Sequence, residues 1–94
     1  MITVKFFAYY RDPEYANCKE LRMEKCEDIF DLGNKLSDMF GEKFRNEFFS
    51  PDGQEIGERT ILMINGRHVQ FLGGIHAPIK DEDTVLVYPV VAGG

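Results

Sequence analysis

The sequence predicts a single small α+β domain in which one amphipathic helix packs on one face of a mixed β-sheet. Three observations support this fold class. The 94 residues leave room for one hydrophobic core, and 44% of them are hydrophobic. Residues 26–40 have the 3.6-residue period of a helix, and the segments around them have the two-residue period of strands. The sequence contains no run of about 18 apolar residues, so it predicts no membrane-spanning segment.

The first predicted element is a strand over residues 2–9. Its even-numbered side chains are apolar and form one face, and its odd-numbered side chains form the second face. Phe7 and Tyr9 make the second face apolar as well. This strand is therefore either covered on both faces or leaves its aromatic side chains for a partner. The alternation returns over residues 19–24, with Leu21 and Met23 on one face, so a hairpin with a long loop is expected.

The helix is predicted over residues 26–40. Acidic residues precede and open it, Asp31 and Lys35 form an i,i+4 pair, and Gly41 supplies a left-handed stop. The last two apolar positions, Met39 and Phe40, are interpreted as core residues. One face of this helix collects the apolar positions Ile29, Leu32, Leu36, Met39 and Phe40.

A second, short helix is predicted after it, because Phe44 and Phe48 are spaced i,i+4 before the turn Ser50-Pro51-Asp52-Gly53. Residues 60–64 then form a β-branched apolar strand that ends in Asn65-Gly66, the strongest short signal for a type I′ hairpin turn. Residues 67–72 are expected to return as a strand with Val69 and Phe71 on one face.

The acidic segment Lys80-Asp81-Glu82-Asp83 is interpreted as a solvated turn before a last strand over residues 84–88, and Pro89 ends the ladder. The first and last strands are the richest in β-branched and aromatic residues, so they should lie side by side at the sheet centre. This order predicts a ubiquitin-like β-grasp fold with about five strands. The domain should span residues 1–89, followed by a flexible tail over residues 90–94.

Charge and cysteine content restrict the classes of partner. The formal net charge is −5, which argues against nucleic acid and favours a basic protein surface, and the N-terminal segment resembles no signal peptide. A cytoplasmic protein with no membrane partner is expected. Cys18 and Cys26 should stay reduced, and with His68 and His76 they lack the ligand spacing of a zinc site, so no metal is predicted.

No enzyme motif is present, and both histidines are interpreted as solvated side chains. The chemistry is expected instead in Val90, Val91, Ala92, Gly93 and Gly94. A glycine pair lets a main chain enter a narrow active site where a Cβ would clash. Adenylation of a terminal carboxylate would make it an electrophile for a sulfur or amine nucleophile.

The sequence resembles the MoaD/ThiS family of ubiquitin-like sulfur carriers, most of all the small subunit of molybdopterin synthase. The resemblance rests on the opening strand, Ile64-Asn65-Gly66, the acidic turn and the ending Tyr88-Pro89-Val90-Val91-Ala92-Gly93-Gly94. In that family two prolines often stand where this chain has Pro89-Val90, and residues 12–19 also differ from the usual pattern.

The resemblance implies that an E1-like activating enzyme uses ATP to adenylate Gly94, which becomes a thiocarboxylate. The tail would then enter the large synthase subunit and pass sulfur to a pyranopterin precursor of the molybdenum or tungsten cofactor. The chain would bind no cofactor itself and would be no enzyme alone. Phe7 and Tyr9 are the expected docking residues. Three alternatives stay open: a modifier conjugated through Gly94, a carrier for thiamine or cysteine synthesis, or a plain interaction domain.

Overall fold

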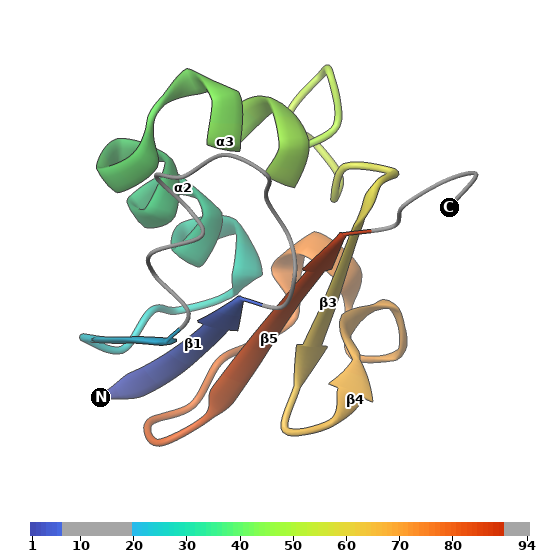
Figure 1. Cartoon of the computed structure of the whole chain (residues 1–94). Helices are drawn as coiled ribbons and strands as arrows, with labels where there is room; N and C mark the ends of the chain where they lie inside the picture. The colour runs from blue at the N-terminus through green and yellow to red at the C-terminus, as the bar shows by residue number, and fades with distance from the viewer. Residues whose placement is uncertain (7–19, 90–94) are drawn as a thin grey trace.

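The computed structural model describes residues 1–6 and 20–89 (Figure 1). The predictions for Phe7, Tyr9 and residues 90–94 lie outside the described residues. The described elements, in chain order, are β1 (Ile2–Phe6), β2 (Glu20–Met23), α2 (Ile29–Phe40), α3 (Glu42–Phe48), β3 (Thr60–Ile64), β4 (Arg67–His68), the 3₁₀ turns η1 (Val69–Phe71) and η2 (Gly74–His76), and β5 (Thr84–Pro89).

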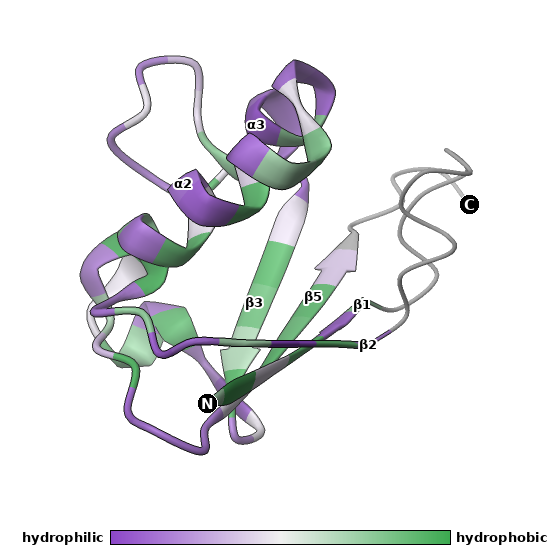
Figure 2. Ribbon diagram, turned by 90° about the vertical axis from the view of Figure 1, so that its left-hand side faces the viewer, coloured by the Kyte–Doolittle hydropathy of each residue, from purple (hydrophilic) through white to green (hydrophobic). Residues whose placement is uncertain are grey.

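The five strands form one mixed sheet in the order β2-β1-β5-β3-β4. β1 and β5 are parallel neighbours at its centre, and the other pairs are antiparallel. Both helices lie on the same side of the sheet (Figure 2). This is the β-grasp arrangement, so the predicted fold class and the central pairing of the first and last strands are confirmed.

The core lies between the helices and the inner face of the sheet. Alternate residues of the central strands point into it, as the two-residue period predicts. α3 adds two fully buried rings, Phe44 and Phe48, stacked 5.6 Å apart. The fully buried members of this core include Ile2, Val4, Ile29, Leu32, Leu36, Val85 and Val87.

The helix begins at Ile29, three residues after its predicted start. Asp28 has extended backbone dihedrals, and its side chain accepts a hydrogen bond from the Asp31 backbone N–H at 2.8 Å. Asp28 is therefore the N-cap, which satisfies one of the donors that a helix start leaves unpaired. The predicted pair of Asp31 and Lys35 is confirmed at 3.4 Å, and Gly41 has a φ of 97° as expected of a stop.

Two apolar predictions are wrong. Met39 is 53% exposed, because the buried face of α2 includes Gly33 and Ser37, and Met39 lies about 120° from Gly33 around the helix axis. Residues 67–72 form a strand only as far as His68. The chain then turns into η1, closed by a hydrogen bond from the Leu72 N–H to the Val69 carbonyl, which leaves Phe71 83% exposed while Val69 is buried.

Candidate functional site

The root of the C-terminal tail is the end of β5 at the centre of the sheet. Pro89 is the last described residue, and it pairs with Thr60 at the start of β3 (Figure 1). The predicted tail residues Val90 to Gly94 follow it and lie outside the described residues. The structure therefore defines where the tail is attached and what holds that point in place.

Thr60 and Gly57 fix this attachment point to α3. The Thr60 hydroxyl donates to the Glu47 carbonyl at 2.7 Å, and its backbone N–H donates to the Gly57 carbonyl at 3.0 Å. The Gly57 N–H donates to the Phe48 carbonyl at 2.7 Å, and a Cβ at Gly57 would lie only 2.2 Å from the Glu47 carbonyl oxygen. Only glycine fits there, so the tail leaves from a rigid platform.

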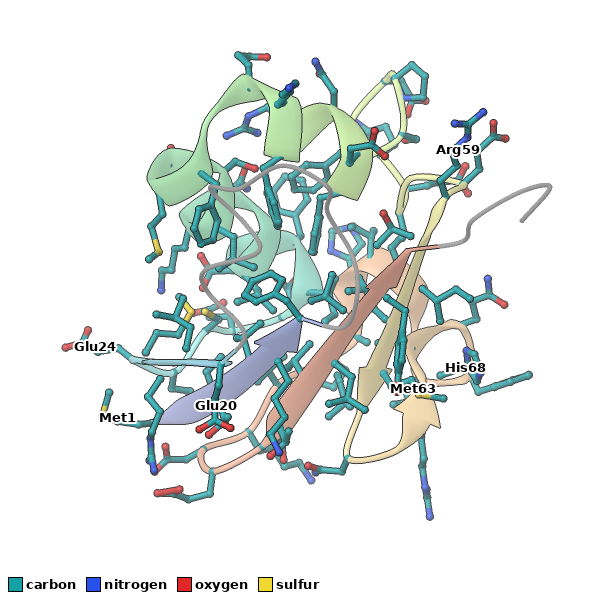
Figure 3. All side chains as sticks on the ribbon, viewed as in Figure 1. Met1, Glu20, Glu24, Arg59, Met63 and His68 are labelled. Atoms are coloured by element: carbon teal, nitrogen blue, oxygen red, sulfur yellow. The ribbon has the colours of Figure 1, made fainter. Side chains whose placement is uncertain are left out.

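The outer face of the sheet, opposite the helices, carries a continuous row of side chains across all five strands. Cross-strand partners share a face, and the registers place Glu20, Lys5, Leu86, Met63 and His68 in one line. Figure 3 shows Met63 and His68 together at the β3–β4 end of this row. The row is charged over β2 and β1, where Lys5 Nζ lies 3.9 Å from Glu20 Oε1, and apolar over β5 and β3.

A second pair on this face, Ile61 and Tyr88, lies next to the tail root. Both side chains are half-buried, like Leu86 and Met63. At the far edge, the exposed Phe71 ring meets the His68 ring edge-on at 6.3 Å. We call Ile61, Met63, Leu86 and Tyr88 the outer apolar patch. It is not covered by either helix, and it adjoins the point from which the tail leaves.

The acidic turn is more than a solvated loop. Asp83 accepts hydrogen bonds from the Lys80 backbone N–H and from Asn65 Nδ2, both at 2.8 Å, and its carbonyl accepts from the Thr3 N–H at 3.0 Å. Asp81 also forms an ion pair with the amino group of Met1. The turn therefore joins the start of β1 to the β3–β4 hairpin. Asn65 and Gly66 have φ values of 51° and 85°, which confirms the predicted type I′ turn.

Among the described residues, no group of three potential metal ligands converges. Cys26 is a free, buried thiol. Burial raises the pKa of the Cys26 thiol; Lys35 opposes this effect, and the carboxylates of Asp31 and Asp28 add to it. The thiol is thus held in its protonated, unreactive form.

The two histidines lie on opposite sides of the sheet. His68 lies on the outer face, whereas His76 lies on the helical side with Nδ1 3.4 Å from Asp28 Oδ2. A groove of about 540 Å³ between the end of α3 and residues 55–59 contains one hydroxyl nucleophile, Ser50, whose Oγ is hydrogen-bonded to Asp52 at 2.7 Å. Neither a histidine nor a cysteine is among the residues that line this groove.

Sequence reasoning placed the docking residues at Phe7 and Tyr9 and missed the outer apolar patch. The signal was present, since residues 61, 63, 86 and 88 are the alternate positions of two predicted strands. It also missed the role of Gly57 and Thr60. No local sequence motif indicates that a glycine three residues before a strand lies close to the carbonyl group of a residue distant in sequence.

A five-stranded β-grasp sheet with both helices on one face is the ubiquitin-like fold. Comparison with known families then gives a specific assignment. The ThiS family model matches residues 4–94, so the chain belongs to the ThiS family. This confirms the resemblance to ubiquitin-like sulfur carriers that the sequence indicated. No curated protein sequence matches significantly.

Several solved structures share the fold over nearly the whole chain. The small archaeal modifier protein 1 of Methanosarcina acetivorans is 28% identical, with a TM-score of 0.78 over 99% of this chain and 95% of its own. CysO of Mycobacterium tuberculosis is 18% identical, with a TM-score of 0.80 over 97% and 100%. CysO of Amycolatopsis orientalis, in its complex with BexX, is 19% identical, with a TM-score of 0.79 over 100% of both chains.

None of the helices in the described part of the chain combines the length and apolar character needed to cross a membrane.

Proposed function

We propose that this protein is a sulfur carrier that works as the small subunit of molybdopterin synthase. Gly94 is adenylated by an E1-like activating enzyme with ATP and is then converted to a thiocarboxylate. The sulfur passes to a pyranopterin precursor inside the large synthase subunit. The family match, which runs through the Gly93-Gly94 pair, supports the sulfur-carrier part of the proposal, and the synthase part rests on the resemblance of residues 88–94.

The geometry of the tail root supports this role. In this proposal residues 1–89 are the folded domain and residues 90–94 are the part that enters the partner. Five extended residues span at most about 16–18 Å, which is enough to bring Gly94 into an active site while the domain stays outside. The rigid platform at Thr60 and Gly57 then limits the directions in which the tail leaves.

The docking surface is the outer face of the sheet. The outer apolar patch supplies apolar area next to the tail, and the net charge of −5 favours a basic partner surface. Phe7 and Tyr9, the docking residues expected from the sequence, remain part of this proposal. Association with the activating enzyme should slow as salt rises; an on-rate independent of salt would contradict the charge argument.

Deletion of Gly94 tests the proposed chemistry. The variant should fold as the parent does but transfer no sulfur to the pyranopterin precursor in the presence of activating enzyme and large subunit. Glu24→Gln is a suitable control, because Glu24 is exposed on the β2 side of the sheet, away from the tail root (Figure 3). Unchanged transfer by the deletion variant would refute a role for Gly94.

A second candidate function is that of a protein modifier, in which a lysine amine captures the activated Gly94. It is favoured by the 28% identity to the small archaeal modifier protein 1. Trypsin cuts after Lys80, so a conjugate would leave residues 81–94 attached to the target lysine. Finding this remnant on cellular proteins would support modification, and its absence alongside sulfur transfer would leave the carrier function alone.

A further inference from the structure

The outer edge of β2 is a strand edge with a regular pattern of backbone groups and charges. β2 is the terminal strand of the sheet, and no other described segment pairs with its outward side. Such edges are available for pairing with another strand.

The register determines which backbone groups point outward. The Thr3 N–H donates to the Asp83 carbonyl at 3.0 Å, so Thr3 directs its backbone groups toward β5. Arg22 is opposite Thr3 in the antiparallel pair with β1 and is therefore in a non-hydrogen-bonded pair. Its N–H and C=O point away from β1, and those of Glu20 do the same two residues earlier. Leu21 and Met23 direct theirs to β1.

The side chains of these two residues carry opposite charges on the outer face. Glu20 Oε1 lies 3.9 Å from Lys5 Nζ, and Arg22 Nη2 lies 3.8 Å from Glu82 Oε2. Both side chains are more than half exposed. Each ion pair directs its β2 member toward β1 and the acidic turn, and more than half of each side chain stays accessible to a further charge.

We propose that two copies of this protein associate by antiparallel pairing of their β2 edges about a two-fold axis at Leu21. This register places Glu20 of each copy opposite Arg22 of the other, and these are the residues with outward backbone groups. Four backbone hydrogen bonds form, and Leu21 lies opposite Leu21. Charges of opposite sign then alternate on the outer face across the paired edges. The row runs from Lys5 and Glu20 of one copy to Arg22 and Glu82 of the second copy.

The register is specific because its alternatives are unfavourable. A two-fold axis at Arg22 places Arg22 opposite Arg22 and Glu20 opposite Glu24, so like charges face each other. A shift by a single residue places outward backbone groups opposite groups that point to β1, and the hydrogen bonds are lost. A four-residue edge is short, so the dimer belongs to the weak, concentration-dependent class.

This association is independent of the proposed function. β2 and the β3–β4 hairpin are opposite edges of the sheet, and the tail leaves from β5 between them. The pairing joins the two sheets edge to edge and covers neither the outer apolar patch nor the tail root. A dimer could therefore present two tails at once.

Amide hydrogen exchange over about a fiftyfold range of protein concentration tests the pairing. The amides of Glu20 and Arg22 should become more protected as concentration rises, in parallel with a doubling of the sedimenting mass. Leu21 and Met23 donate within the sheet and should be protected at every concentration, which provides an internal control. Concentration-independent exchange of Glu20 and Arg22, or a monomeric mass throughout, would overturn the proposal.

Charge reversal tests the register. Glu20→Arg and Arg22→Glu should each lose the association, because like charges then face each other across the edge. An equimolar mixture of the two variants should restore it as a heterodimer, since every cross-edge pair is again opposite. Glu24→Arg makes the same charge change outside β2 and should still dimerise. Dimerisation of either single variant alone, or no association in the mixture, would refute this register.

Discussion

Replacement of Gly57 by alanine tests whether residue 57 fixes the tail root. The new Cβ would lie 2.2 Å from the Glu47 carbonyl oxygen, more than 1 Å short of the 3.4 Å at which ordinary contact begins. The obstacle is backbone, so no side-chain rotation relieves it. Residue 57 must therefore move, and this weakens two hydrogen bonds. Its N–H donates to the Phe48 carbonyl, and its carbonyl accepts from the Thr60 N–H.

Overpacking of this kind costs about 1–3 kcal/mol, and each weakened hydrogen bond adds about 1 kcal/mol. With two hydrogen bonds weakened, we expect a total loss of about 3–5 kcal/mol in the free energy of unfolding. For a domain of this size, that lowers the melting temperature by roughly 12–40 °C. Chemical denaturation and thermal melting, each followed by circular dichroism, measure the two quantities.

Gly53→Ala is the matched control. Gly53 has open space around a Cβ but a φ of 73°, so alanine there costs only about 1–2 kcal/mol from the left-handed backbone. Gly57→Ala should therefore be the less stable variant, and amide exchange at Thr60 should be faster in it. Equal stability of the two variants would show that the close approach at Gly57 is not a constraint.

Three further predictions concern other parts of the chain. Iodoacetamide should label Cys26 only when the protein unfolds. Because the pKa of the folded Cys26 thiol is raised, the thiol contributes stability below its ordinary pKa of 9.0, and this contribution is lost as pH rises through the folded pKa. Cys26→Ala should therefore flatten the alkaline part of the curve of unfolding free energy against pH. Hydrogen bonds from the Gln54 N–H and the Ser50 hydroxyl lower the pKa of Asp52, so Asp52 stabilises the fold above pH 3.8 and loses this effect as pH falls through its folded pKa. Asp52→Ala should therefore flatten the acid part of the curve of unfolding free energy against pH, and an unchanged acid part would contradict this reasoning. Met63→Asp should lower affinity for the activating enzyme by about tenfold or more while the fold is retained, whereas equal affinity by calorimetry would exclude the outer apolar patch from docking.

The fold was predictable from sequence where local chemistry and tertiary packing agree. Asn65-Gly66 can adopt the two positive φ values of a type I′ turn, so the hairpin followed directly from the sequence. Phe44 and Phe48 were predicted as one helical face, and both are fully buried. In each case the residue type alone restricts the backbone or the burial.

Prediction failed where a choice depends on contacts distant in sequence. The apolar alternation of Val69 and Phe71 matches a strand, yet the chain turns after His68 and exposes Phe71. Met39 matches the helix period but lies at the edge of the stripe. The close approach at Gly57 depends on where α3 lies, which no local pattern encodes. The predicted roles of Phe7, Tyr9 and residues 90–94 stay predictions.

The most direct test of the carrier function is the mass of the protein, with C-terminal fragmentation, after incubation with ATP, a sulfur source and the E1-like activating enzyme of its host. Exchange of one oxygen for sulfur has nearly the mass of a methionine oxidation, and the chain has four methionines, so the change must be localised. We predict sulfur on Gly94. An unmodified Gly94, with the same enzyme active on another carrier, would contradict the proposed function.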